Sequence, residues 1–245
     1  MAELRIGCSG FNYPHWRGNF YPQGLPQRKW LQHYCSIFST VELNVTFYRL
    51  PLPSTFEKWH NETPDNFAFS LKGSRYITHV RKLAEPEESL EMFFRGALLL
   101  KNKLKVILWQ FPPSYKLNIP RLKGFLKLLN KYPVRNTLEF RHESWISQDT
   151  ISLCMENNMS MCMSDWPVFN DDLPVTSDFV YIRRHGFGGG YDTCYSEDFL
   201  RKDAGRIKAY IKKNRDVFIY FNNDASGYAP RNAKELSGLL RNISI

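Results

Sequence analysis

The stretch from Asn136 to Trp145 reads Asn-Thr-Leu-Glu-Phe-Arg-His-Glu-Ser-Trp, and its pattern decides the fold class. Apolar residues alternate with Glu139 and Arg141, which is the two-residue period of a β-strand with two different faces. His142 follows where this pattern ends. The stretch therefore predicts a strand with one apolar face that delivers chemically capable side chains at its carboxyl end.

Seven further stretches share this plan, an apolar run that ends in polar residues. They are residues 5–9, 40–47, 66–72, 105–111, 159–165, 178–185 and 216–222. Helical patterns lie between most of them, at residues 27–38, 53–60, 85–100, 121–131, 149–157 and 197–213, and a last one follows at 230–240. Strands that alternate with helices are expected to be parallel and joined by helical crossovers.

Eight such units in 245 residues match the (β/α)8 TIM-type barrel, a class with eight parallel strands and outer helices. An open doubly wound sheet is the alternative, but it usually carries a Gly-x-Gly-x-x-Gly turn after the first strand, which this sequence lacks. No change in composition marks a linker. We therefore expect a single domain over residues 1–245.

The composition is basic, with 33 Lys plus Arg against 24 Asp plus Glu and a formal net charge of +9. This excess is compatible with an anionic partner such as a phosphate, a nucleic acid or an acidic metabolite. The structural alternative is that the cations cover solvated outer helix faces. Lys123, Lys127 and Lys131, for example, recur every four residues in one helical pattern.

Several features predict a cytoplasmic protein. No apolar run approaches the roughly 20 residues that cross a bilayer, and the first residues lack the order of a signal peptide. The five cysteines form no Cys-x-x-Cys pair, which favours reduced core thiols over disulfides or a zinc cluster. The oligomeric state is left open.

In barrels of this type, function collects at the carboxyl ends of the strands and on the loops that follow them. Polar residues of this sequence gather there. The candidate site residues are Glu42, Asn44, Lys72, His79, Gln110, Glu139, Arg141, His142, Asp165, Arg183, His185, Asn222, Asn223 and Asp224.

The residue types suggest acid–base chemistry. Glu139 or Asp165 is predicted as the general base, and His185 or His142 as the proton donor. Asp165 is the better base if fewer cations surround it, because Arg141 beside Glu139 should lower the pKa of that carboxyl.

The remaining candidates would bind the substrate. The cations Lys72, Arg141 and Arg183 would hold a phosphate or carboxylate, and the amides of Gln110, Asn222 and Asn223 would bind hydroxyl groups. Hydrolysis, isomerisation and lyase chemistry all fit this set of residues.

Each of these predictions has a structural alternative. Glu42 and Glu139 could pair with Lys72 and Arg141 only to neutralise one another. The two histidines, His142 and His185, could merely cap strand ends. The glycine-rich segment 186–190 could cradle a phosphate on backbone N–H groups or form a flexible lid.

Ordered motifs at these strand ends also carry a family resemblance. They include Gly7-Cys-Ser-Gly-Phe11, Val41-Glu-Leu-Asn-Val-Thr-Phe-Tyr48, Phe69-Ser-Leu-Lys72, Gln110-Phe-Pro-Pro113, Glu139-Phe-Arg-His142, Arg183-Arg-His-Gly186 and Tyr220-Phe-Asn-Asn-Asp224. With single matches at Trp16, Trp59, Asp165 and Tyr195, the chain resembles the YecE-like family, a domain of unknown function (number seventy-two). The resemblance implies a (β/α)8 barrel and no established activity. Arg184 departs from the family pattern, where an apolar residue is commoner, and would leave the site unchanged if it faces outward.

Three functions compete at this stage. The first is an enzyme that acts on a small anionic or polyhydroxylated substrate at the strand ends. The second is a metal-dependent phosphoesterase or nuclease, in which Glu42, Glu139, Asp165, His185 and Asp224 would bind Mg²⁺ or Mn²⁺. No His-x-His or His-Glu-x-x-His spacing supports it, and no cofactor is evident. The third is a non-catalytic protein that binds nucleic acid through basic helices and exposed aromatic residues.

Overall fold

A computed structural model describes residues 2–241 of the chain, and every strand pair resolved in it is parallel. The strands are β1 (Leu4–Cys8), β2 (Thr40–Leu43), β3 (Ala68–Lys72), β4 (Leu104–Gln110), β5 (Arg135–Glu139), β6 (Ser160–Met161), β7 (Met163–Ser164), β8 (Phe179–Arg184) and β9 (Asp216–Phe221). The α-helices are α1 (Trp30–Cys35), α2 (Val45–Tyr48), α3 (Pro53–Glu62), α4 (Glu87–Ala97), α5 (Ile119–Leu129), α6 (Gln148–Glu156), α7 (Glu197–Lys212) and α8 (Tyr228–Leu240).

The eight predicted strands are all present, and the sixth is divided into two short pieces. Cys162 separates β6 from β7. β6 pairs with β5 through Met161 and Leu138, whereas β7 pairs with β8 through Met163 and Ile182. The predicted alternation of parallel strands and helices is therefore confirmed.

The predicted end of the second strand was wrong. The strand was expected to continue to Phe47, but β2 ends at Leu43 and the one-turn helix α2 follows. Val45 and Tyr48 face solvent while Thr46 and Phe47 are buried, which is a helical and not an alternating arrangement. The β-branched pair after Asn44 suggested a strand, and tertiary contacts outweighed this propensity.

The predicted helix at residues 27–38 is shorter than expected. A 3-10 turn (Gln27–Lys29) leads into α1, which ends at Cys35. Ile37 was expected on the buried stripe, but it is exposed because it lies beyond the helix end. Trp30 and Tyr34 are fully buried as predicted.

The chain divides into two compact units with interleaved sequences. Unit 1 comprises the residues up to Glu42, residues 163–172, and those from Asp178 onward. Unit 2 comprises residues 43–162 and 173–177. The expectation of a single domain stays a prediction, and each unit is described by itself below.

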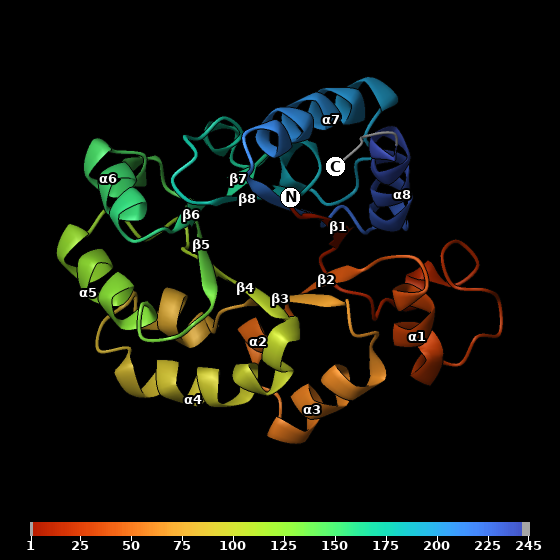
Figure 1. Ribbon diagram of the computed structural model, residues 1–245, viewed down its shortest axis with the longest axis horizontal. Helices are drawn as coiled ribbons and strands as arrows, with labels where there is room; N and C mark the ends of the chain where they lie inside the picture. Colours follow the sequence, from red (N-terminus) through yellow and green to blue (C-terminus); the bar gives the residue numbers. More distant parts are fainter. Residues whose placement is uncertain (1, 242–245) are drawn as a thin grey trace. The chain divides into compact units, whose positions relative to one another are not determined.

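Unit 1 pairs the first strand of the described chain with its last strand. Its strands follow the order β2-β1-β9-β8-β7, and β1 pairs with β9 from Leu4 and Val217 to Cys8 and Phe221. A Cβ atom at Gly7 would lie 2.4 Å from the Thr40 carbonyl oxygen, so glycine permits the close approach of β1 and β2. The helices α7 and α8 pack against each other beside these strands (Figure 1).

Unit 2 has the strand order β6-β5-β4-β3 and an aromatic core. Trp109 of β4 is fully buried, and its ring packs against Phe93 of α4 and Phe125 of α5. A Cβ atom at Gly73 would lie 2.2 Å from the Trp109 ring, so the absence of a side chain there makes room for the indole. Figure 1 shows α3 and α4 next to each other in this unit.

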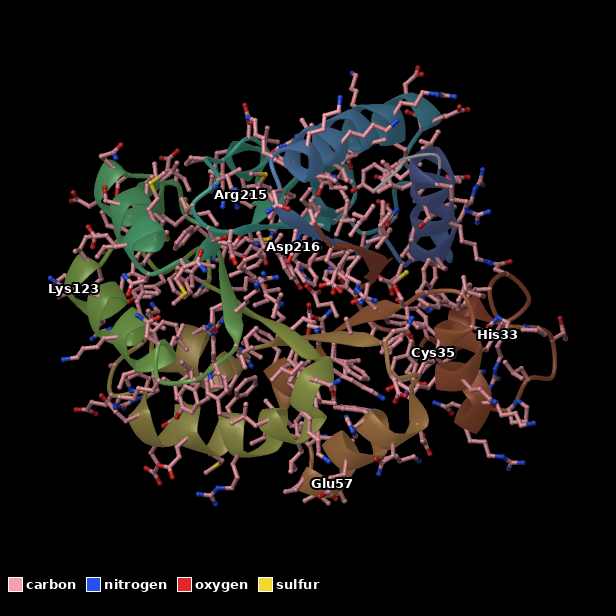
Figure 2. The ribbon with its side chains drawn as sticks, in the orientation of Figure 1. His33, Cys35, Glu57, Lys123, Arg215 and Asp216 are labelled. Carbon is pink, nitrogen blue, oxygen red and sulfur yellow. The ribbon has the colours of Figure 1, made fainter. Side chains whose placement is uncertain are left out.

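The basic residues of the outer helices are solvated, as the structural alternative predicted. Lys123, Lys127 and Lys131 are all exposed, and Figure 2 shows Lys123 on α5 pointing away from the strands of its unit.

Within residues 2–241, no helix is long and apolar enough to cross a membrane. The five cysteines, all within residues 2–241, form no disulfide, and their being reduced stays a prediction.

Candidate functional site

In unit 2 the strand register aligns three predicted site residues at one edge. Lys72 is the last residue of β3, Gln110 the last of β4 and Glu139 the last of β5. Gln110 lies directly opposite Glu139 in the ladder, and Lys72 is opposite Leu108. Parallel strands thus place their carboxyl ends together, as the sequence predicted for these residues.

Glu139 and Arg141 form a buried ion pair at the end of β5. The Arg141 Nη2 atom donates to Glu139 Oε1 at 2.5 Å, and both side chains are almost completely shielded from solvent. The guanidinium fixes the orientation of the carboxylate. The predicted pairing of these two residues is confirmed, whereas their part in binding or catalysis stays a prediction.

Lys72 and His79 share one aromatic support. The Lys72 Nζ atom lies 4.2 Å from the centre of the Phe47 ring, and the His79 ring packs edge-on against the same ring at 4.9 Å. Thr46 Oγ1 donates to the carbonyl oxygen of Lys72 at 2.6 Å, which ties α2 to the end of β3. The short helix that replaced the predicted end of the second strand therefore builds the wall of this cluster.

His79 lies in a π-helical turn, residues Tyr76–Val80. Such turns are rare and occur often at functional sites. Its Nδ1 atom is 2.8 Å from the Thr78 hydroxyl, and the side chain is half-buried. This local structure holds the imidazole in place while it remains partly accessible.

The surroundings of His79 keep its imidazole neutral. Burial lowers its pKa most, and the cations of Lys72, Arg75 and Arg141 lower it further, whereas Glu139 acts in the opposite direction. The resulting pKa is about 4. Three cations against one carboxylate indicate a positive potential at His79.

Three other predicted residues of unit 2 have different surroundings. Asn44 follows the end of β2, where it has a helical backbone conformation, and it is half-buried like Gln110. The Nδ1 atom of His142 accepts the backbone N–H of Ser144 at 3.1 Å and caps the turn Glu143–Trp145. This capping agrees with the structural alternative for His142, and its proposed role as a proton donor is untested.

Unit 1 holds a second polar cluster, centred on Glu42. Arg183 donates to Glu42 Oε1 from Nη2 at 2.7 Å and from Nε at 3.2 Å, and Tyr181 donates to Oε2 at 2.7 Å. All three side chains are buried. The sequence suggested Lys72 as the partner of Glu42, but the carboxylate pairs with Arg183.

His185 follows β8 and is completely buried. Its Nε2 atom lies 3.4 Å from Arg183 Nη1, and its Nδ1 atom lies 3.1 Å from the Asn222 amide. Both neighbouring atoms are N–H donors, and a neutral imidazole has one accepting nitrogen, so His185 can accept from Arg183 or from Asn222 but not from both at once. The structure thus brings Arg183, His185 and Asn222 of the predicted set together.

Asp165 has donors on both carboxylate oxygens. The backbone N–H of His185 donates to Oδ1 at 2.8 Å, and the Tyr195 hydroxyl donates to Oδ2. The Tyr195 oxygen also accepts the N–H of Gly186 at 2.6 Å. Asp165 therefore fixes the turn that carries His185. Its predicted role as general base is untested.

Burial and the neighbouring Asp165 carboxylate both raise the pKa of Tyr195, so its hydroxyl stays protonated and continues to donate. Tyr195 is one of the single residues that match the family, but it was not predicted as a site residue. Its spacing from Asp165 along the chain gave no sign of this contact, because the two residues are 30 positions apart.

The last predicted residues of unit 1 have mainly structural contacts. The Asn223 side-chain amide is buried and donates to the carbonyl oxygen of Thr193 at 2.7 Å and to Asn232 Oδ1 at 2.9 Å. Asp224 is half-buried, and burial raises the pKa of its carboxyl. The Nε2 atom of His15, a residue that was not predicted for the site, lies 3.6 Å from Asp224 Oδ2.

Across residues 2–241, no group of three or more His, Cys, Asp or Glu side chains is arranged to hold a metal ion. The metal-dependent alternative and the absence of a cofactor both stay predictions.

Solved structures define the class of protein. A crystal structure of a DUF72 family protein from Thermotoga maritima matches with a TM-score of 0.86 and 29% identity, covering 98% of this chain and 99% of that one. D-psicose 3-epimerase of Clostridium cellulolyticum H10 matches with a TM-score of 0.62 at 7% identity, a likeness of fold alone. These structures confirm the predicted fold class, the (β/α)8 TIM-type barrel.

The chain belongs to the family described as "Protein of unknown function DUF72", which matches residues 5–244. The YunF protein of Bacillus subtilis (strain 168) is 29% identical, covering 97% of this chain and 94% of that protein. The YecE protein of Escherichia coli (strain K12) is 30% identical over 117 residues, 43% of each chain. The predicted membership of the YecE-like family is thus confirmed.

Proposed function

We propose that the protein is an enzyme that binds a small anionic or polyhydroxylated substrate at the carboxyl ends of its strands and transfers a proton. The observation that carries this proposal is the environment of His79 in unit 2. Lys72, Arg75 and Arg141 act on a half-buried imidazole whose pKa is about 4. Such perturbed groups are concentrated at functional sites.

The anion would be held by Lys72 and Arg141. Arg141 carries a planar guanidinium, a group that suits phosphate and carboxylate oxygens, while Lys72 provides a compact charge. Gln110, opposite Glu139 at the end of β4, would bind a hydroxyl group of the same molecule. The substrate would be small, because the proposed binding residues span no more than three neighbouring strand ends and one turn.

His79 would accept the proton. A neutral imidazole has a free lone pair at physiological pH, and the Thr78 hydroxyl fixes its orientation at Nδ1. The sequence favoured Glu139, Asp165, His185 and His142 for acid–base work, with His79 only as a binding residue. The proposal gives His79 the proton transfer and leaves Glu139, oriented by Arg141, as the carboxylate beside it.

The proposal is tested by turnover in a mixture of sugar phosphates and sugar acids in D2O, followed by proton NMR. We expect the wild-type protein to convert or deuterate at least one component. Histidine-to-glutamine replacement at position 79 (H79Q) should lower the rate by roughly 10²–10⁴-fold, the usual contribution of a positioned acid or base. Lys123→Met, which removes a cation from the outer face of α5, is the control and should retain activity.

Conversion that is unchanged in H79Q would place the chemistry elsewhere and contradict the proposal. So would a wild-type protein that binds components of the mixture and never alters them. We also propose that the protein works in the cytoplasm, where its five cysteines would stay reduced.

A further inference from the structure

Two short segments beside the Lys72 and His79 cluster expose large apolar side chains. In α2 and the residues after it, Tyr48 is 76% exposed and Leu52 72% exposed. In the π-helical turn, Tyr76 is 52% exposed and Val80 61% exposed. Scattered single apolar residues need no explanation, but a concentration of them marks a binding surface.

These exposed side chains are not needed for the core of unit 2. Other residues of the same two segments already face inward, since Phe47 is buried and Ile77 and Thr78 are completely shielded. The outward-facing Tyr48 and Tyr76 therefore add apolar surface without adding to the packing. Packing therefore does not explain why these apolar side chains lie next to the Lys72 and His79 cluster.

The apolar and cationic surfaces meet at the Phe47 ring. Lys72 Nζ lies 4.2 Å from its centre, the His79 ring lies at 4.9 Å, and the Tyr48 ring lies at 5.0 Å with perpendicular planes. Arg75 directly precedes the turn that carries Tyr76 and is exposed. A ligand that reaches Lys72 at this ring thus has Tyr48 on the same ring, and the His79 ring there belongs to the turn that also exposes Tyr76 and Val80.

We infer that the unit 2 site takes an amphipathic anion, a phosphate or carboxylate joined to an aromatic or aliphatic group. The charge of Lys72, Arg75 and Arg141 selects the anionic end, and the exposed tyrosines and Val80 cover the apolar end. This inference rests on the proposed anion site and narrows its substrate class. Purely polyhydroxylated molecules without an apolar group are poorer ligands in this assignment.

Isothermal titration of the wild-type protein compares inorganic phosphate with phenyl phosphate at one pH and one ionic strength. We expect phenyl phosphate to bind about tenfold more tightly or better, the gain expected when roughly half of a phenyl ring leaves water. In the double variant Y48S/Y76S the affinity for phenyl phosphate should fall to that for inorganic phosphate, and the affinity for inorganic phosphate should stay unchanged. Met155→Ser, an exposed apolar residue on α6 of the same unit, is the matched control and should keep the preference.

The outcomes separate this inference from the proposed function. If both anions bind equally, the apolar contact is overturned and the anion site stands. If neither anion binds, the anion site itself fails and the inference fails with it. The third outcome is that the wild-type protein shows no preference for phenyl phosphate but binds phosphatidylcholine vesicles that contain phosphatidylserine, and that Y48S/Y76S abolishes this binding. In that case the two segments form a membrane-binding surface and the inference is wrong.

Discussion

His79 lies half-buried among three cations, whereas His142 uses one ring nitrogen to cap a turn and His185 is completely buried. The three side chains are chemically identical, so their surroundings alone decide what each can do. An imidazole that burial and nearby cations keep neutral has an unprotonated nitrogen that can face a bound molecule. One that is enclosed with N–H groups of Arg183 and Asn222 on either side, as in His185, is better suited to positioning its neighbours.

The low pKa of His79 predicts a pH dependence of stability. An ordinary histidine titrates near 6.5, and His79 in the folded state titrates near 4. Between these values the unfolded chain binds a proton that the folded chain does not, so acidification favours unfolding. Urea unfolding at several pH values should show that H79Q loses less free energy of unfolding between pH 7 and pH 4 than the wild-type protein.

Other groups titrate equally in both proteins and cancel in this comparison. Parallel stability curves for the two proteins over this pH interval would show that His79 is an ordinary histidine.

At the residue scale, sequence reasoning succeeded where partners are close along the chain. Glu139 and Arg141 lie two positions apart at the end of one strand, and their pairing could be predicted. Glu42 and Arg183 are 141 positions apart, and nothing in either local sequence indicates the other. The sequence indicated Lys72 and Arg141 as counter-charges for Glu42 and Glu139, and only the folded chain brings Arg183 to Glu42.

At the scale of elements, β8 illustrates how one strand serves two environments. Its neighbouring residues Arg183 and Arg184 point to opposite faces, as successive strand residues do. Arg183 reaches Glu42, whereas Arg184 is buried against α7, where Nε donates to Asp203 Oδ2 at 2.7 Å. Arg184 also pairs with Asp171 at 2.9 Å. Arg184, the residue that departs from the family pattern, thus faces away from the site and links α7 to β8 through its ion pair with Asp203.

Replacing Arg184 by methionine should destabilise the protein strongly. The change leaves the buried carboxylate of Asp203 without its counter-charge, which costs about 3–5 kcal/mol in comparable pairs. The double variant R184M/D203L should recover most of this loss, because apolar groups of similar volume can replace a buried pair. The measurement is the urea midpoint at constant m-value.

Arg201→Met provides the control on the same helix. Arg201 pairs with Glu197 on the exposed face of α7, and such pairs contribute about 0–1 kcal/mol. Equal losses in R184M and R201M would mean that the buried pair adds nothing beyond a surface pair.

Element boundaries were harder to predict than element types. The strand pattern after Thr40 continued through Thr46 in the sequence, yet the chain turns into α2 after Leu43. The sixth strand was predicted as one piece, and it pairs with its neighbours on either side of Cys162. In both places the pairing of distant segments decides the outcome, and a local window of sequence does not contain that information.

At the scale of the whole molecule, the count of strand–helix units in a chain of 245 residues was enough to predict the fold class. Alternation and length are properties of the entire sequence and survive errors at single boundaries. The division into two interleaved units was not predicted, since it depends on contacts between segments far apart in the chain.

The cysteines allow a test of the whole folded molecule. Cys8, Cys154 and Cys162 are buried, and burial raises the pKa of the Cys154 thiol to about 12. Since the thiolate is the reactive form, a thiol reagent at pH 8 should modify only the half-buried Cys35 and Cys194 in the native protein. In denaturant without reductant all five should react, and a smaller total would reveal a disulfide.

The pairing of β1 with β9 joins residues more than 200 positions apart. During translation β1 emerges before β9, so the edge of β1 that receives β9 stays unpaired until the residues between them have been made. Most of unit 2, by contrast, is a continuous run that becomes available for folding midway through synthesis. The nascent chain therefore carries an open β-edge on β1 during this interval, and chaperones that cover such edges would act there.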